Sequence, residues 1–265
     1  MTPNAERHPE HVQSLERGLA VIRAFAGEEG TLSLTDVARR CDLTRAAARR
    51  FLLTLMHLGY VSQDGRGFAL RPRVLELGAA YLSGVGFLDV ARPHLEAVSH
   101  AVQESASISV LDGDEIVYVA RVPIRRIMSV TIANGTRFPA HLTSMGRVLL
   151  AARPDDEVRA LLQRTLTGAA PATPRTPTDP DRVLDAVVDA RRHGYALVDQ
   201  ELEEGLRSVA VPIVDGSGTT VAAMNVAAHA ARRSTADLLD EVLPALRAAA
   251  QEIRDDLRRT GATVD

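Results

Sequence analysis

The spacing of apolar positions divides this chain into a helical first part and a later part that mixes helices with strands. Over residues 12–26 the apolar side chains recur at intervals of three and four, which predicts an amphipathic helix. From Ser107 onward the apolar period falls to two, which predicts β-strands. The pattern therefore predicts an α+β protein in which a helical N-terminal unit with one hairpin precedes a larger mixed domain.

Within the first unit the sequence predicts two short helices separated by a three-residue turn. Ser33, with Asp36 three residues later, is typical of a capped helix start, and Thr44 is typical of a second one. Residues 41–43 make the turn, and Gly59 ends the second helix. Residues 60–70 then predict a hairpin with two glycines at its tip. Two helices, a short turn and a following hairpin predict a winged helix-turn-helix.

The second of these helices has one apolar face and one cationic face. Ala48, Leu52 and Leu55 fall with Phe51 on one side, while the other side is basic and residues 44–58 contain no acid. Arginine forks onto guanine or pairs with phosphate, alanine contacts the thymine methyl, and a helix N-terminus holds phosphate. Taken singly, each arginine is equally consistent with a solvated surface charge, but their arrangement favours DNA. The expected DNA contacts are Ser33, Thr44, Arg45, Ala46, Ala47, Arg49, Arg50 and Arg66.

The later part of the chain predicts further elements in a fixed order. Helices are expected over residues 73–83 and 87–104, followed by a hairpin over 107–119 and a third strand over 128–132. Short helices over 144–151 and 154–162 precede a proline-rich surface loop at 165–180. The remaining elements are a helix over 181–193, strands over 196–200, 208–214 and 219–227, and a helix from Ser234 to about residue 259.

Composition narrows the class of protein. The hydrophobic fraction of 46% and the charged fraction of 25% are those of an ordinary globular chain. No apolar run approaches the ~18 residues of a membrane helix, and the polar start of the chain has no secretory pattern. Cys41 is the single cysteine, so neither an internal disulfide nor a cysteine-built metal site is possible. We therefore expect a cytoplasmic protein with no membrane association.

The distribution of charge supports a division between the two parts. The net charge is −3, from 31 basic and 34 acidic residues, and every basic residue is arginine. Residues 14–75 hold ten arginines and six acids, a charge of +4, which leaves −7 for the rest of the chain. A basic first unit on an acidic remainder is consistent with a nucleic-acid partner for the first unit alone.

The second part shows no strong catalytic pattern. It lacks G-x-S-x-G, the P-loop motif and H-E-x-x-H, so neither an enzyme nor a cofactor is expected. The acidic run at 199–204 could hold a metal with His193 or His229. A charged loop at a strand end explains that run more simply, and no metal site is predicted.

Several stretches closely resemble the IclR family of bacterial transcription regulators. In the first unit these are residues 12–19, 34–58 and 75–78, and the run at 43–55 resembles the protocatechuate and 4-hydroxybenzoate regulators of the β-ketoadipate pathway. Asp42 departs from the glycine of many helix-turn-helix turns, but aspartate tolerates the left-handed conformation. The resemblance spans about residues 12–258, and its later matches are residues 134–136, 140–151, 194–195, 199–201, 205–212 and 221–227.

The resemblance implies that the second domain is GAF-like and binds a small metabolite. Ser144 begins a helix whose free N–H groups suit a carboxylate, and Arg137 and His141 flank the same loop. Ser208 and Asn225 are polar positions in apolar strands, and either is also consistent with a satisfied core group. Leu142 and Val130 are expected in an apolar floor. The expected effector-binding residues are Met128, Asn134, Gly135, Arg137, His141, Thr143, Ser144, Met145, Gly146, Ser208, Asn225 and Ala227.

These expectations define an organisation and a function. Residues 1–11 and 260–265 are tails, 12–72 the winged helix-turn-helix, 73–86 a linker helix and 87–259 the effector domain. The partners are operator DNA, an aromatic or dicarboxylic acid, and further copies of the chain as a dimer or a dimer of dimers. The subgroup resemblance favours an activator. The rival hypotheses are a constitutive DNA-binding protein whose second domain only oligomerises, and an enzyme fused to a DNA-binding domain.

Overall fold

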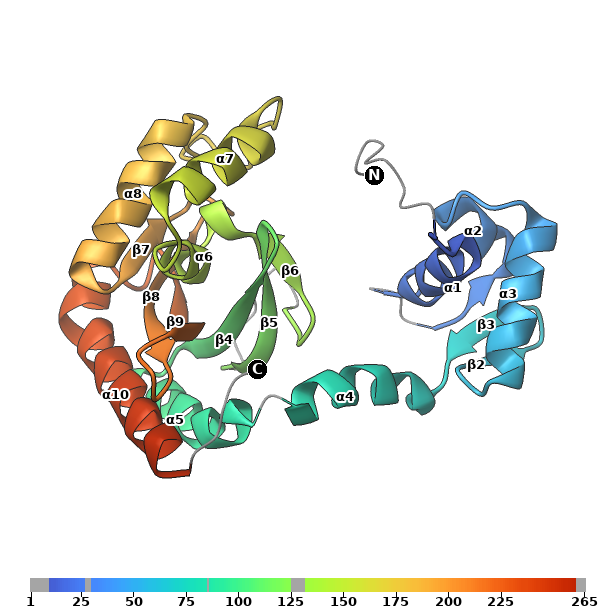
Figure 1. The fold of residues 1–265 in the computed structure, drawn as a ribbon, viewed down its shortest axis with the longest axis horizontal. Helices are drawn as coiled ribbons and strands as arrows, with labels where there is room; N and C mark the ends of the chain where they lie inside the picture. Colours follow the sequence, from blue (N-terminus) through green and yellow to red (C-terminus); the bar gives the residue numbers. More distant parts are fainter. Residues whose placement is uncertain (1–9, 27–29, 85, 125–131, 261–265) are drawn as a thin grey trace. The chain divides into compact units, whose positions relative to one another are not determined.

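The computed structural model describes residues 10–26, 30–84, 86–124 and 132–260. It divides into two compact units, Met1–Tyr81 and Leu82–Asp265, and each is described by itself (Figure 1). Within the described residues, no helix combines the length and apolarity that crossing a bilayer requires.

The first unit is a helix-turn-helix followed by a hairpin, as the sequence predicts. Two short strands at the hairpin pair with a third, so that the small antiparallel sheet has the order β1-β3-β2. Its elements are α1 (Gln13–Arg23), β1 (Leu32–Ser33), α2 (Leu34–Arg40), α3 (Arg45–His57), β2 (Val61–Asp64) and β3 (Gly67–Leu70). The core of the unit consists of Val21, Phe25, Leu32, Val37, Ala38, Ala48, Leu52, Leu55, Val61 and Phe68.

Local chemistry sets the ends of the two central helices. The Ser33 hydroxyl accepts from the Asp36 N–H at 3.2 Å, and the Thr44 hydroxyl accepts from the Ala47 N–H at 3.2 Å, so both predicted caps are confirmed. Asp42 adopts the left-handed conformation with φ +51°, and Gly59 ends α3 with φ +83°. The turn therefore keeps its geometry although aspartate stands where glycine is common.

After the hairpin the chain continues through a 3₁₀ turn at Pro72–Val74 into α4 (Leu75–Gly84). The sequence predicts one continuous helix over this stretch. Proline supplies a fixed φ and no N–H donor at its first position, which suits the opening turn. The boundary between the two compact units falls after Tyr81, inside α4.

The second unit is built on a six-stranded antiparallel sheet with the order β6-β5-β4-β9-β8-β7. Helices cover both faces of this sheet (Figure 1). The strands are β4 (Ser105–Asp112), β5 (Glu115–Val122), β6 (Arg137–Pro139), β7 (Ala196–Asp199), β8 (Leu206–Val214) and β9 (Thr220–His229). The helices are α5 (Phe87–Val102), α6 (Ser144–Leu150), α7 (Asp155–Leu166), α8 (Pro180–His193), α9 (Thr235–Asp237) and α10 (Leu243–Thr260).

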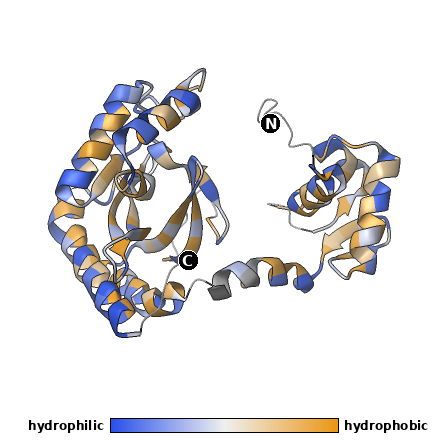
Figure 2. Ribbon diagram, in the orientation of Figure 1, coloured by the Kyte–Doolittle hydropathy of each residue, from blue (hydrophilic) through white to orange (hydrophobic). Residues whose placement is uncertain are grey.

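Two hydrophobic cores lie on opposite faces of the sheet. Residues such as Leu95 of α5 and Leu246 of α10 pack on one face, and Met145 of α6 and Leu162 of α7 pack on the other. Figure 2 shows the strands mostly hydrophobic between helices whose outer faces are hydrophilic. The strands alternate less clearly than a half-exposed sheet because both of their faces are covered.

The structure differs from the sequence-based prediction in three elements. The strand expected over residues 128–132 lies outside the described residues except for Ile132, which is not in a strand, and the third strand is β6 instead. Helix α7 extends to Leu166, because its apolar positions continue to pack against the core. Ser234 caps a helix as predicted, and Asp237 completes the capping box, but a π-helical turn at Leu238–Val242 then separates α9 from α10.

Candidate DNA-binding surface and effector cavity

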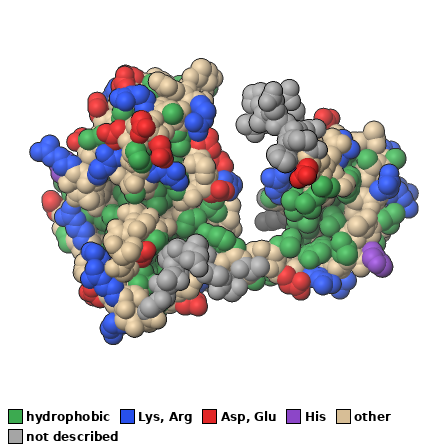
Figure 3. Space-filling view, in the orientation of Figure 1, with side chains coloured by type: hydrophobic (Ala, Val, Ile, Leu, Met, Phe, Trp, Pro, Cys, Tyr) green, Lys and Arg blue, Asp and Glu red, His purple; other side chains and the backbone are tan. Residues whose placement is uncertain are grey.

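Helix α3 presents its arginines outward, as the sequence predicts. Ala48, Leu52 and Leu55 are buried in the core of the first unit, whereas Arg45, Arg49, Arg50 and Ala46 are exposed and Ala47 is half-buried. Figure 3 shows cationic side chains gathered over the α3 side of this unit. In the described part of the chain, the three guanidinium groups have no carboxylate partner that would neutralise them.

The neighbouring groups complete this surface. Thr44 caps α3 and is exposed, so the positive end of the helix dipole faces outward beside the arginines. Arg66 is exposed at the tip of the β2–β3 hairpin. Ser33 is half-buried, and its hydroxyl already donates to Asp36 at 2.6 Å. A cationic helix and a cationic hairpin tip are arranged to meet a polyanion.

The second unit contains a cavity of about 230 Å³ on the α6 side of the sheet. Its walls come from β5, β8 and β9, from the turn before α6, and from the loop between β7 and β8. The lining residues are Tyr118, Arg121, Ile132, Phe138, Leu142, Thr143, Val198, Leu202, Glu203, Leu206, Ser208, Asn225 and Ala227. The volume is below the roughly 300–1,000 Å³ of pockets for drug-sized ligands, so it suits a smaller molecule.

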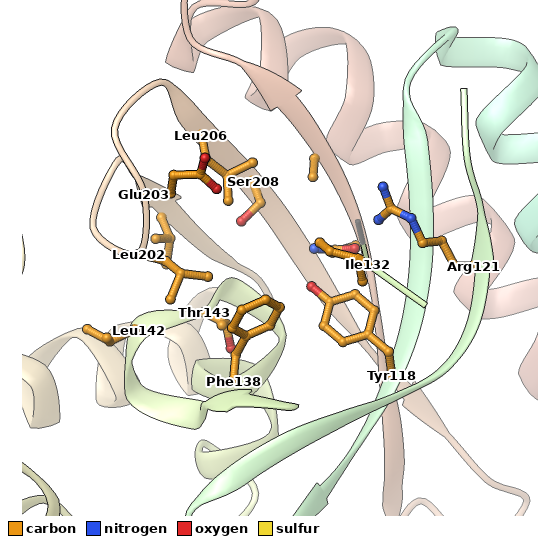
Figure 4. A pocket seen from close by; sticks show the side chains of 13 residues that line it. Tyr118, Arg121, Ile132, Phe138, Leu142, Thr143, Leu202, Glu203, Leu206 and Ser208 are labelled. Atoms are coloured by element: carbon orange, nitrogen blue, oxygen red, sulfur yellow. The ribbon is translucent and has the colours of Figure 1, made fainter. Parts of the chain in front are cut away.

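Polar groups converge on an otherwise apolar cavity. Figure 4 shows Arg121 and Glu203 on opposite sides, with the hydroxyl groups of Tyr118 and Ser208 directed into the space between them. Arg121 donates to the Ser107 hydroxyl at 3.2 Å, and burial lowers the pKa of its guanidinium, which nevertheless stays cationic at neutral pH. The Oδ1 atom of Asn225 is buried and has no hydrogen-bond partner among the described residues. The cavity therefore offers a cation and an unsatisfied polar group to a ligand.

Aromatic and aliphatic side chains shape the rest of the cavity. The rings of Tyr118 and Phe138 meet edge-to-face, with centroids 5.9 Å apart and an interplanar angle of 78°. Burial raises the pKa of Tyr118 to about 12, so its hydroxyl is neutral at physiological pH. The cavity thus combines a neutral phenol and apolar walls with two charged groups, Arg121 and Glu203, on opposite sides.

Four of the twelve residues expected at the effector site line this cavity: Thr143, Ser208, Asn225 and Ala227. Ser144 lies directly behind them, where its hydroxyl shares a 2.8 Å hydrogen bond with that of Ser208 and is fully buried. The N-cap of α6 is Thr143, whose hydroxyl accepts from the Gly146 N–H at 3.0 Å. One of the free N–H groups that the sequence assigns to a ligand carboxylate is therefore already occupied.

The other expected residues lie elsewhere or outside the described residues. Asn134 and Gly135 are exposed in the turn before β6, and Arg137 is held outside the cavity by ion pairs to Glu115 at 2.7 Å and to Asp112 at 2.8 Å. Met145 is core, and Gly146 is required because a Cβ there would lie 2.0 Å from the Ala140 carbonyl oxygen. Met128 and Val130 lie outside the described residues.

Sequence reasoning missed Arg121, Tyr118 and the loop residues Leu202 and Glu203. Tyr118 and Arg121 are three positions apart on one strand, which a strict period of two places on opposite faces. The register shifts between Ile108 and Ser109 of β4, so one extra residue of β5 bulges out between Tyr118 and Arg121. The bulge reverses the alternation of side chains along β5, so that both Tyr118 and Arg121 face the cavity.

His141 lines a second cavity, of about 290 Å³, together with Asp114, Leu166 and Thr176. The imidazole is 5% exposed. Burial, followed by the nearby charge of Arg147, lowers its pKa to about 4, and Asp114 opposes this shift. His141 is therefore neutral at physiological pH and is not a cationic partner for an acid.

The neutral burial of His141 predicts a loss of stability in mild acid. Its pKa is about 6.5 when unfolded and about 4 when folded, so between these values the unfolded chain binds a proton that the folded protein does not. We expect this residue to cost about 2 kcal/mol of unfolding free energy between pH 7 and pH 5. Urea unfolding of wild type and His141→Asn at both pH values measures it. Equal losses in the two proteins would contradict the prediction.

Two acids of the run at 199–204, Asp199 and Glu201, are engaged with arginines. Asp199 accepts from Arg207 at 2.6 Å and also pairs with Arg175, and the hydrogen bond from Arg207 is the main reason that its pKa is lowered. Glu201 pairs with Arg147. Among the described residues, no group of three or more histidine, cysteine or acidic side chains is placed to hold a metal ion.

An outward cationic helix in a helix-turn-helix and a ligand-sized cavity in a second unit together define a DNA-binding protein with a sensory domain. Family comparison agrees with this class. The model of the IclR helix-turn-helix domain matches residues 14–65, and that of the bacterial transcriptional regulator IclR C-terminal domain matches residues 79–255. The chain therefore belongs to the IclR family, and it is a DNA-binding transcription regulator and not an enzyme.

Individual relatives narrow the comparison. The chain is 44% identical to the Pca regulon regulatory protein of Pseudomonas putida, over 92% of this chain and 84% of that protein. It is 37% identical to the p-hydroxybenzoate hydroxylase transcriptional activator of Acinetobacter baylyi, over 94% and 93%. A crystal structure of an IclR homolog from Microbacterium hydrocarbonoxydans complexed with 4-hydroxybenzoate superposes with a TM-score of 0.80, at 26% identity over 93% of this chain and 99% of that one.

Proposed function

We propose that this regulator senses a small aromatic carboxylic acid of the hydroxybenzoate class and controls genes for the breakdown of such acids. The observation that carries the proposal is the cavity itself, which combines one arginine with an apolar, aromatic-walled interior and has the Glu203 carboxylate on the side opposite the arginine. The names of two relatives refer to the pca and p-hydroxybenzoate systems, and a solved homolog holds 4-hydroxybenzoate, which supports the same ligand class.

Each part of a hydroxybenzoate has a complementary group in the cavity. The carboxylate pairs with Arg121, a contact that is stronger inside the protein than in water. The ring packs among Ile132, Phe138 and Leu206. A ring hydroxyl donates to the unsatisfied Oδ1 of Asn225, so that binding removes an unpaired buried acceptor, or it bonds with Ser208.

The acid acts by changing the balance between arrangements of the regulator. A ligand shifts such an equilibrium only by binding one arrangement better than another. We propose that the bound arrangement favours productive operator binding and that the protein is an activator, as the name of the Acinetobacter relative supports for its own case.

Calorimetry with 4-hydroxybenzoate, 3,4-dihydroxybenzoate and β-ketoadipate tests the ligand class. We expect heat from the first two acids and operator footprints that change when either is added. If only β-ketoadipate gives heat, the effector is a dicarboxylic acid and not an aromatic acid. No heat from a broad panel of acids would favour the rival protein whose second domain only oligomerises.

We propose that two chains pair through their first units and read a palindromic operator. The supporting observation is that apolar side chains of α1 and of the start of α4 are unusually exposed, with Leu15 63%, Leu19 46% and Leu75 70% accessible. Figure 3 shows hydrophobic side chains collected on this unit. Helix-turn-helix dimers read two half-sites about one helical turn apart, which requires such a pairing surface.

The pairing predicts that charge on α1 dissociates the dimer. The double variant Leu15→Glu, Leu19→Glu is expected to sediment as a smaller species than wild type, because burying two carboxylates at an interface is unfavourable. Val188→Glu, at an exposed valine of α8 in the second unit, is the control. Sedimentation velocity measures the size of each species. If the double variant associates as wild type does, the interface does not include α1.

A further inference from the structure

Arg147 of α6 makes contacts that span two separate segments of the second unit. It is 4% exposed, and its Nε donates to the carbonyl oxygen of His141 at 3.0 Å. Its Nη1 donates to Oε1 of Glu201 at 3.1 Å, and its Nη2 donates to the other carboxylate oxygen. One guanidinium therefore joins the turn before α6 to the loop between β7 and β8.

These two segments supply two walls of the effector cavity. Leu142 and Thr143 directly follow His141, and Leu202 and Glu203 directly follow Glu201. Arg147 is not itself among the residues that line the cavity. It thus touches the residue immediately before each wall without reaching the ligand space.

The far side of the same loop is held by other contacts. The hydroxyl of Thr173 donates to the Gln200 carbonyl at 2.7 Å, and that of Thr176 donates to the Glu201 carbonyl at 2.6 Å. The Gly205 N–H donates to the Gln200 side chain at 3.1 Å. These hydrogen bonds hold the backbone of the loop on the side away from α6. On the side toward α6, the Arg147–Glu201 pair connects the loop to the opposite wall of the cavity.

We infer that Arg147 and Glu201 form a positioning pair that fixes the separation of the two walls and so sets which aromatic acids fit. As far as the ligand is concerned, this rests on the function proposed above. Only a planar guanidinium can fork onto a carboxylate and donate to a carbonyl in a third direction, whereas lysine is a single point charge. A buried pair of this kind adds little net stability compared with apolar side chains, so its main consequence is geometrical.

The test uses the full-length protein and two alternative variants. Arg147→Lys keeps the charge and loses the fork, and the double variant Arg147→Met, Glu201→Leu removes both charges together, which avoids leaving one buried and unpaired. Arg191→Lys is the matched control, since Arg191 also joins two backbone carbonyls, of Ala151 and Arg153, to a carboxylate, but it does not line the cavity.

Two measurements are made on each variant. Hydrogen exchange without ligand reports the backbone amides of residues 142–143 and 202–205, and calorimetry reports the affinities for 4-hydroxybenzoate and 3,4-dihydroxybenzoate. We expect faster exchange at both walls, an affinity for 4-hydroxybenzoate that is about tenfold weaker, and a changed ratio of the two affinities. Arg191→Lys is expected to match wild type in all three.

The outcomes separate this inference from the proposed function. If exchange at either wall stays at the wild-type rate, the positioning role is contradicted. If both affinities weaken by one common factor, the pair has only a general structural role, and the positioning role is again contradicted. If wild type binds neither acid, the proposed ligand class fails, while exchange still decides whether the pair holds the walls. If Arg147→Lys does not fold, the double variant carries the test, and if neither folds, the pair is needed for folding and the inference is rejected.

Discussion

Arg121→Met is expected to weaken 4-hydroxybenzoate binding by about a hundredfold or more, because it removes the cation that we propose pairs with the ligand carboxylate. Methionine keeps much of the length and apolar contact of the arginine stem, so the loss reports the charge more than the packing. Operator binding without ligand should be unchanged, since Arg121 belongs to the second unit.

The control for this prediction is Arg137→Met. Arg137 lies on the neighbouring strand β6, and the sequence alone makes it, with His141, a candidate carboxylate partner. Its ion pairs to Asp112 and Glu115 direct it away from the cavity. Isothermal titration calorimetry of the two variants should therefore give opposite results. A large loss for Arg137→Met together with wild-type affinity for Arg121→Met would place the acid in a different site.

The double variant Arg45→Ala, Arg49→Ala is expected to reduce operator affinity by about 2–6 kcal/mol, or roughly a thousandfold, if each arginine forks onto a guanine. Both side chains are exposed on α3, one helical turn apart, without a carboxylate partner among the described residues. Fluorescence anisotropy with operator DNA at fixed salt measures the loss, because binding of this kind depends steeply on salt.

The control here is Arg259→Ala, an exposed arginine of α10 that is 77% accessible. It changes the net charge by one and belongs to the second unit, so its effect should be small. The dependence on salt separates two roles of α3. Loss of arginines that contact phosphates reduces the salt slope equally on every sequence, while loss of arginines that contact bases relaxes discrimination at particular positions. Operator binding at wild-type strength in the double variant would exclude α3 as the recognition helix.

Local sequence signals predicted the first unit well because its structure depends on short-range chemistry. The caps at Ser33 and Thr44 and the left-handed residue Asp42 each involve neighbours within five positions. The apolar face of α3 follows from helical periodicity alone. The outward direction of Arg45 and Arg49 is then the geometric consequence of burying Ala48 and Leu52.

The effector cavity was predicted less completely because it depends on long-range pairing. The polar positions Ser208 and Asn225 stood out within apolar strands and do line the cavity. Arg121 is one of 31 arginines and carries no local signal, since its direction depends on the bulge in β5. His141 and Arg137 are close in sequence to residues that line the cavity. In the structure, however, His141 lines a different cavity and Arg137 pairs with Glu115 at the surface.

For this protein, sequence alone determined the helix ends, the cationic recognition surface and the family, because each is encoded by residues close together along the chain or by a pattern shared across it. Tertiary structure alone decided which side chains enclose the ligand space and how Arg147 joins its walls. The cavity brings together residues that lie far apart in the sequence between Tyr118 and Ala227, and strand register and helix packing set where each of them points.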